Sequence, residues 1–260
     1  MVQRLRYFGS VKETTFNEAT PPVATAHVDI ASATLDTPSE PDIIYAGGLQ
    51  RTAKTRRPGF YAPAGNVVYA FDIDSIGEYL RYALGGYVFT AATPEATLNT
   101  HEFYGDASAT LPSFVARLGK DKLADNTNFE HVFSGCTLNS LSIAVSDALA
   151  EATLDIQAAQ DSRADILAVT DLLLPTSYPL AFHELIASLN SVDRSVLIKS
   201  AEFTINNNAA VGDGRSIGSR FPRRIPVGER ATTFTFELFW DSIAQLQLFW
   251  GGNDGPIIGP

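Results

Sequence analysis

The sequence predicts a mainly β subunit, a barrel or sandwich with one or two packed helices and long extended loops. Period-two alternation of apolar and polar residues recurs in several segments, whereas helical spacing recurs in few. The chain has 260 residues, of which 45% are hydrophobic, so it is long enough to bury a sizeable core. Strands that outnumber helices favour a sheet closed on itself or packed on a second sheet.

The clearest strands form a predicted hairpin. Within 137–145, one face carries Leu141, Ile143 and Val145, and 149–157 alternates in the same way. The short polar stretch between these two segments suits a hairpin turn. The same reasoning predicts further strands over 111–118, 129–135, 196–206 and 230–240.

Helical spacing is clearest over 74–84, where apolar residues form one stripe. Asp74 or Ser75 is the expected N-cap, and the glycine pair that follows Leu84 is the expected stop. Two further helices are predicted, over 241–250 and over 161–173.

Two segments, 46–65 and 207–230, are rich in Gly, Pro and Arg and show neither period. They hold nine of the 19 cations and two of the 29 acidic residues, so the remainder has ten cations and 27 acidic residues. An acidic body with two basic loops favours self-association, with the loops of one copy on the acidic surface of the next. Ordinary solvated loops are the alternative. The cations are Arg51, Lys54, Arg56 and Arg57 in the first segment and Arg215, Arg220, Arg223, Arg224 and Arg230 in the second.

Composition excludes several function classes. A net charge of −10 argues against a general binder of nucleic acid or anionic membranes, since both need surplus Lys and Arg. The single cysteine, Cys136, excludes an internal disulfide framework and a cysteine-based zinc site. The start of the chain lacks the apolar stretch of a signal peptide, and no run of about 18 apolar residues occurs. We therefore expect a soluble product made in the cytoplasm, without membrane insertion.

No motif in the chain indicates catalysis. The four histidines, His27, His101, His131 and His183, do not have the spacing of metal ligands, and no Gly-x-Ser-x-Gly elbow occurs. The glycines of 212–218 lack the spacing of a dinucleotide fingerprint. A triad assembled from distant residues stays open. The expectation is a protein that is not an enzyme, with no catalytic residue, cofactor or metal.

Six pieces nevertheless occur in a recognisable order between residues 65 and 250. They are DSIGEYLRYALGG, the aromatic stretch through His101-Glu102-Phe103, LPSFVARLGKD, FSGCTLNSLSIAVSDALAEATLDIQA, IKSAEFTINNNAAVGDG and ERATTFTFELFWDS. In this order the chain resembles the tail tube proteins of long-tailed double-stranded DNA viruses, the bacteriophages and their archaeal relatives. No single motif is unique, and the specificity lies in their order.

The resemblance implies a structural virion protein without a cofactor or an active site. Its copies would form rings, usually hexameric, that stack into a hollow tail tube through which the genome passes into the host. Implied partners are further copies of the chain, other tail proteins (tip, terminator, tape measure, and a sheath if the tail contracts) and viral DNA in transit. The implied location is the virion tail, after assembly in the host cytoplasm.

The same resemblance divides the chain into an N-terminal arm with the first strands (1–45), an extended basic loop (46–65) and a barrel domain (66–260) that includes 207–230. Because Lys and Arg in a lumen would bind DNA, we expect Asp and Glu from one barrel face to line it. The arm, with Tyr7 and Phe8, and the basic loops are expected to contact neighbouring subunits or rings. The candidate contact residues are Arg4, Arg6, Arg51, Lys54, Arg56, Arg57, Arg215, Arg220, Arg223 and Arg224.

Three alternatives remain at this point. A related ring protein of the tail end or of a secretion tube would share these features. A soluble β-barrel that binds a small ligand would account for the many aromatic residues, and an enzyme of unknown type would reveal itself by turnover. The number of copies in the assembly distinguishes a binding module from a tube protein, because the module stays monomeric or dimeric whereas the tube protein forms rings or filaments.

Overall fold

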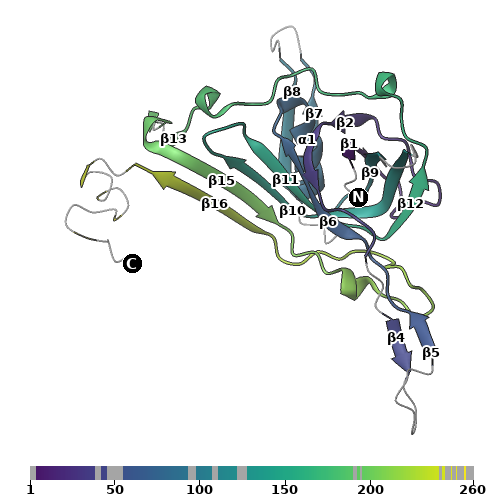
Figure 1. The fold of residues 1–260 in the computed structure, drawn as a ribbon. Helices are drawn as coiled ribbons and strands as arrows, with labels where there is room; N and C mark the ends of the chain where they lie inside the picture. Colours follow the sequence, from purple (N-terminus) through teal and green to yellow (C-terminus); the bar gives the residue numbers. More distant parts are fainter. Residues whose placement is uncertain are drawn as a thin grey trace.

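The computed structural model shows a mainly β protein, as predicted, with one α-helix in the part of the chain that it describes (Figure 1). The described residues are 4–38, 42–45, 55–92, 98–106, 111–121, 128–189, 192–193 and 195–239, and single residues near the C-terminus. The elements are β1 (Arg4–Lys12), β2 (Ala26–Val28), β3 (Ile30–Ala33), β4 (Asp42–Tyr45), β5 (Thr55–Pro58), β6 (Ala64–Ala70), α1 (Ile73–Leu84), β7 (Gly85–Thr90), β8 (Thr100–Gly105), β9 (Phe114–Asp121), β10 (Phe129–Val145), β11 (Glu151–Gln157), β12 (Gln160–Ala164), β13 (Ser188–Leu189), β14 (Val192–Asp193), β15 (Ile198–Asn206) and β16 (Ala231–Leu238).

One large antiparallel sheet dominates the fold. Its strand order is β2-β1-β9-β10-β11-β6-β3, and β12 and β15 also pair with β10. Strand β16 pairs with β15, and this β15–β16 ribbon leads away from the core toward the C-terminus (Figure 1). Three small hairpins, β4–β5, β7–β8 and β13–β14, lie outside the sheet.

Strand β10 joins the two halves of the sheet. It is 17 residues long, and its first half pairs with β9 and β12 whereas its second half pairs with β11 and β15. Gly135 adopts a φ of 60°, and the register against β9 shifts between Phe133 and Cys136. The sequence predicts two strands, 129–135 and 137–145, because the alternation breaks at this point. That division is wrong, since a left-handed glycine lets one strand bend and continue.

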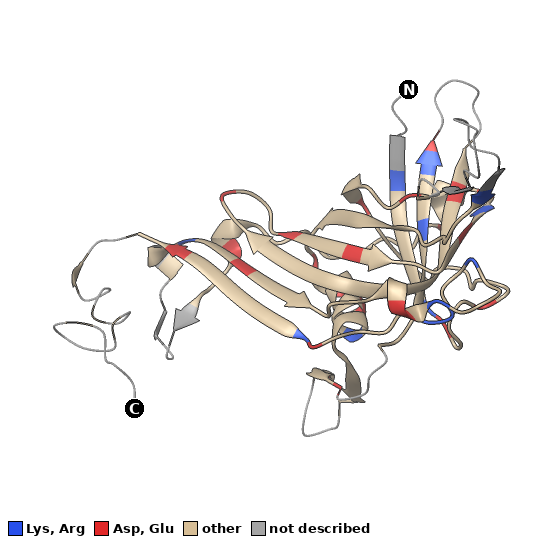
Figure 2. Cartoon of the chain, turned by 90° about the horizontal axis from the view of Figure 1, so that it is seen from below, with Lys and Arg blue, Asp and Glu red and all other residues tan. Residues whose placement is uncertain are grey.

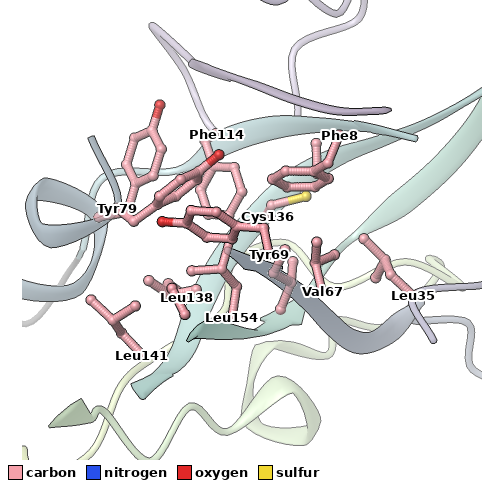
Figure 3. Packing of buried hydrophobic residues seen from close by; sticks show 14 of the residues in the cluster. Phe8, Leu35, Val67, Tyr69, Tyr79, Phe114, Cys136, Leu138, Leu141 and Leu154 are labelled. Carbon is pink, nitrogen blue, oxygen red and sulfur yellow. The ribbon is translucent and has the colours of Figure 1, made fainter. Parts of the chain in front are cut away.

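The core lies inside the curled sheet and is covered by α1 (Figure 1). Aromatic rings gather where α1 meets the sheet, and the Tyr82 and Phe114 rings stack with their centroids 4.4 Å apart. Figure 3 shows Tyr69, Tyr79 and Phe8 packed toward the same centre. Burying each large side chain contributes about 1.5–3 kcal/mol to stability, so this cluster supplies much of the driving force for folding.

Helix α1 confirms the prediction over 74–84, but its cap differs. Asp72 is the N-cap, and its side chain accepts a hydrogen bond of 2.7 Å from the Ser75 backbone N–H. Asp74, one of the two expected caps, instead accepts hydrogen bonds from the backbone of 176–177. The helix ends at Gly85, whose φ of 88° suits glycine.

Most predicted strands are confirmed. The hairpin is β10–β11, 196–206 is β15, 230–240 is β16, and 111–118 corresponds to β9. The predicted helix over 161–173 is wrong, because this segment contains the end of β12 and a 3-10 turn, Val169–Asp171. Pairing with the open edge of β10 outweighs the approximate helical spacing there. The helix predicted over 241–250 falls on a segment of which only single residues are described.

Residues 4–12, within the predicted N-terminal arm and first strands, form β1, a strand inside the large sheet. Strand β1 lies between β2 and β9, and Tyr7 and Phe8 are fully buried. Neighbouring residues in a strand point to opposite faces, so both faces of β1 are covered. Alternation does not mark such a strand, so the sequence predicts first strands within 1–45 without giving their bounds.

Replacing Gly135 with Ala tests the bend in β10. A Cβ at this position would lie 2.8 Å from the Ala159 Cβ, and the alanine backbone would have to keep a positive φ. We expect the variant to lose about 1–3 kcal/mol in free energy of unfolding, measured by urea denaturation. Gly212→Ala is the matched control, because no atom lies within 4 Å of its Cβ position and its φ is not positive. If the two variants are equally stable, the bend does not need a glycine.

Candidate assembly surfaces

A continuous polar face covers the outer side of the sheet formed by β11, β10, β15 and β16. Because side chains alternate along a strand, the residues that register places in one row share a face. The rows are Asp155-Ser140-Asn206-Ala231, Thr153-Ser142-Thr204-Thr233 and Glu151-Ala144-Glu202-Thr235, with Glu237 beyond them beside Ser200. No lysine or arginine occupies these register positions.

Hydrogen bonds order the side chains of this polar face. The Ser142 hydroxyl donates to Glu202 Oε1 at 2.6 Å, and Thr204 donates to Ser142 at 3.2 Å. Lys199, from an irregular position in β15, lies 2.9 Å from Glu237 at one margin. Figure 2 shows mostly Asp and Glu along these long strands, whereas Lys and Arg gather mainly in the half of the molecule that carries the N-terminus. The face therefore offers hydroxyls and carboxylates to solvent.

The opposite face of the same strands is apolar and passes out of the core onto the β15–β16 ribbon. Leu141 and Ile205 are buried under the body, but Phe234 and Phe236 are 61% and 42% exposed. Phe234 pairs with Phe203, which packs against the core, so the two phenylalanines extend the core face without a cover. The outer edge of β16 has no strand partner among the described residues. An exposed edge with an apolar face is a template for another chain.

The two basic segments meet in one subunit, at a contact between 59–61 and 215–221 that we call the basic junction. The Arg220 Nε–H donates to the Gly59 carbonyl at 3.2 Å, and the Tyr61 N–H donates to the Arg220 carbonyl at 2.9 Å. The Arg215 guanidinium lies over the Phe60 ring, 4.2 Å from its centroid. Aromatic and guanidinium groups attract each other in this geometry, so the junction is held by specific contacts.

Both predicted basic loops contain local structure where they are described. Strands β4 and β5 pair with each other and project away from the large sheet (Figure 1). Residues 46–54, between them in the sequence, are not described. Residues 207–230 contain a 3-10 turn, Val211–Gly214, and a buried Ile225. Periodicity is absent from 207–230 because neither a sheet nor an amphipathic helix forms its main contacts.

The predicted contact residues are found in different settings. Arg57, Arg223 and Arg224 are exposed, whereas Arg215 and Arg220 take part in the basic junction. Arg6 Nε lies 2.9 Å from Asp121 of its own subunit. Arg51 and Lys54 lie outside the described residues, as do the side chains of Arg4 and Arg56.

A polar cluster behind the basic junction attaches it to the sheet. The Asp161 carboxylate accepts hydrogen bonds from the Tyr61 hydroxyl and from Thr37 Oγ1 at 2.6 Å, and lies 2.7 Å from His131 Nε2. Lys120 Nζ lies 3.2 Å from the other nitrogen of the His131 ring. Burial raises the pKa of Asp161, but these hydrogen bonds outweigh burial and hold the pKa below its usual value. Sequence reasoning missed the cluster because its members come from separate segments.

A second buried network closes the other side of the sheet. The Arg117 guanidinium pairs with Glu130, and the Tyr7 hydroxyl donates to the same carboxylate at 3.0 Å. Arg117 also donates to the carbonyls of 21–22, which fastens that segment to β9. Burial raises the pKa of Tyr7 to about 12, so the phenol stays protonated and acts as a hydrogen-bond donor at neutral pH.

The remaining chemically reactive residues have ordinary structural settings. His27 packs edge-on against Tyr7, His101 lies against Tyr87, and His183 is exposed. Cys136 is fully buried, and burial raises the pKa of its thiol well above the usual value. Within the described ranges, no three His, Cys, Asp or Glu side chains are placed to hold a metal ion. In the same ranges, no helix has the length and apolar character needed to cross a membrane.

Comparison with known proteins gives one assignment. A family model described as phage tail tube protein matches residues 4–257, which is nearly the whole chain. No curated protein matches the sequence.

Asp161→Asn tests the polar cluster. Because its pKa is lower in the folded protein than in the unfolded chain, the ionised carboxylate stabilises the fold above its ordinary pKa of about 3.9, and this stabilisation is lost as pH falls through the folded pKa. We expect the variant to lose about 1–3 kcal/mol in free energy of unfolding at pH 7, because buried donors lose their acceptor. Thermal unfolding measured at decreasing pH should show that, below about pH 4, the variant loses less stability than the native protein does. Equal acid sensitivity in both proteins would contradict this role of Asp161.

Proposed function

Because the chain belongs to the phage tail tube protein family, we propose that its copies close into rings, most simply hexamers, which stack into the hollow tube of the virion tail. Viral DNA passes through this tube from the capsid into the host. The protein assembles in the host cytoplasm with other tail proteins, namely the tip, the terminator, the tape measure and, in a contractile tail, the sheath. Its function is structural.

The polar face is the observation that supports this proposal most directly. A wall that guides DNA must not bind it, and binding to DNA arises chiefly from Lys and Arg that displace condensed counterions. The polar face combines hydroxyls with the carboxylates of Glu151, Asp155, Glu202 and Glu237, and its register positions carry no cation. We assign this face to the lumen, where like charge repels the phosphates and keeps the duplex mobile.

The β15–β16 ribbon supplies the joint between neighbours in the ring. Its polar side continues the proposed lumen wall, while Phe234 and Phe236 lie on the other side and are exposed in a single copy. If β16 adds to the sheet of the next copy, its free edge is paired and the two phenylalanines are covered by that copy's body. The same head-to-tail contact, repeated around an axis, closes a ring.

The basic segments then belong to contacts between rings. We propose that 46–65 and 207–230 reach toward the adjacent ring, with Arg51, Lys54, Arg56 and Arg57 on the first segment, and that Arg4 and Arg6 lie near the same boundary. The division into an arm with the first strands (1–45), a basic loop (46–65) and a barrel domain (66–260) stays part of this proposal, with β1 as one of the first strands.

Charging the apolar side of the ribbon tests ring closure. In Phe234→Asp/Phe236→Asp both replaced side chains are exposed, so we expect unfolding free energy to change by less than about 1 kcal/mol. Rings seen by negative-stain electron microscopy should disappear, because two carboxylates would be buried against the next copy. Val88→Asp/Phe89→Asp is the matched control, since these residues of β7 are 42% and 50% exposed. Rings formed equally well by both variants would exclude the ribbon as the joint.

Chemical labelling tests which surface faces the lumen. Cys136 is buried, so Thr204→Cys introduces a single accessible thiol in the middle of the polar face. In assembled tubes this thiol should react with a small maleimide but not with a maleimide coupled to a large globular protein. The disassembled subunit is the control and should react with both reagents. Equal reaction of tubes with the large reagent would place the polar face on the outside.

A further inference from the structure

The segment 165–187, which we call the strap, leaves its apolar side chains in water although its backbone is firmly attached. Leu173 exchanges hydrogen bonds with His27, and the Leu180 N–H donates to the Phe71 carbonyl at 2.9 Å. Yet Val169 is 68% exposed, Leu173 62%, Tyr178 91% and Ile186 79%. A fixed chain that exposes this many large apolar side chains has the character of an interface rather than of a solvated loop.

The strap is also acidic. It contains Asp165, Asp171 and Glu184, and no lysine or arginine. All three carboxylates are exposed, so a partner that covers the apolar side chains would also meet negative charge. The chemistry required of the partner is therefore an apolar group flanked by cations.

The loop 207–230 of this same chain has that chemistry. Ile217, at its tip, is fully exposed, next to a turn in which Gly218 adopts a φ of 88°. Arg223 and Arg224 are exposed on the same loop, and the basic junction holds the loop in position through Arg220. An apolar side chain with arginines nearby complements the strap in both hydrophobicity and charge.

Residues 176–180 of the strap lie at the opposite end of the subunit from the loop, so these two segments do not meet within one copy. The strap contacts Phe71 just after the end of β6, whereas the basic junction precedes its start, and seven residues of strand span about 20 Å. Helix α1 gives the same separation. The strap binds Asp74 in its first turn, while Arg230 donates to the carbonyl of Leu84 at its last residue.

We propose that the strap of one subunit receives the 207–230 loop of the subunit stacked on it, with Ile217 among the apolar side chains and Arg223 and Arg224 facing Asp165 and Asp171. The partner is a second copy of this chain in the same orientation, because only a head-to-tail arrangement brings opposite ends together. The inference rests on the proposed stacking of rings and names the surfaces that carry it.

Cysteine cross-linking tests this contact directly. The double variant Ile217→Cys/Tyr178→Cys should give a ladder of disulfide-linked multimers under mild oxidation, since every copy carries both halves of the contact. Each single variant is a control and should give at most dimers. A double variant that yields no more than the single variants overturns the inference. Rings without cross-linked multimers would overturn this contact but leave the proposed rings standing. Cross-linked multimers without rings would support this contact and count against ring closure.

A charge exchange between the loop and the strap provides a second test of this contact. Arg223→Glu/Arg224→Glu should lower the amount of sedimenting tube about tenfold or more while single rings persist. Lys12→Glu/Arg163→Glu changes the net charge equally at exposed residues of β1 and β12 and should leave tubes intact. Adding Asp165→Arg/Asp171→Arg to the loop variant should restore tubes. Normal tubes from the loop variant, or no recovery in the combined variant, would overturn the pairing.

Discussion

Both halves of the large sheet share β10, so the bend at Gly135 fixes their relative orientation. The half before the bend pairs with β9 and β12 and carries Glu130 and His131, the acceptor and the imidazole around which the two buried polar networks form. The half after the bend pairs with β11 and β15 and carries the polar face on its outer side. A straight strand would hold the two halves of the sheet in one layer, whereas the bent strand lets the sheet curl around a single core.

The sequence predicted the elements whose two faces differ. Strand β11 and helix α1 each bury one side, and β15 alternates between a polar and an apolar face, so their periods are visible in the chain. The sequence predicted first strands within 1–45 but not the bounds of β1, because Tyr7 and Phe8 are both buried, which removes alternation. The Asp161 cluster and the basic junction could not be predicted, since each depends on residues far apart in sequence that only the tertiary fold brings together. Composition did predict where the arginines gather, but not that their two segments contact each other.

Charge and packing are separated along the subunit in a way that suits a structural role. Carboxylates on the polar face have hydroxyl neighbours, whereas the cations are concentrated around the basic junction and are linked to the sheet through Tyr61. A shift at the junction is therefore transmitted to Asp161, His131 and β10 through short hydrogen bonds rather than through a mobile linker. Such a linkage makes the junction and the sheet behave as one stiff unit within the subunit.

The buried thiol of Cys136 has a consequence for how the protein responds to oxidants. Exposed thiolates are oxidised or linked to each other in oxidising surroundings, whereas a reducing cytoplasm keeps thiols reduced. Full burial and a raised pKa keep this sulfur protonated and out of reach of oxidants. The subunit therefore presents no accessible thiol in either kind of surroundings, since Cys136 is its single cysteine.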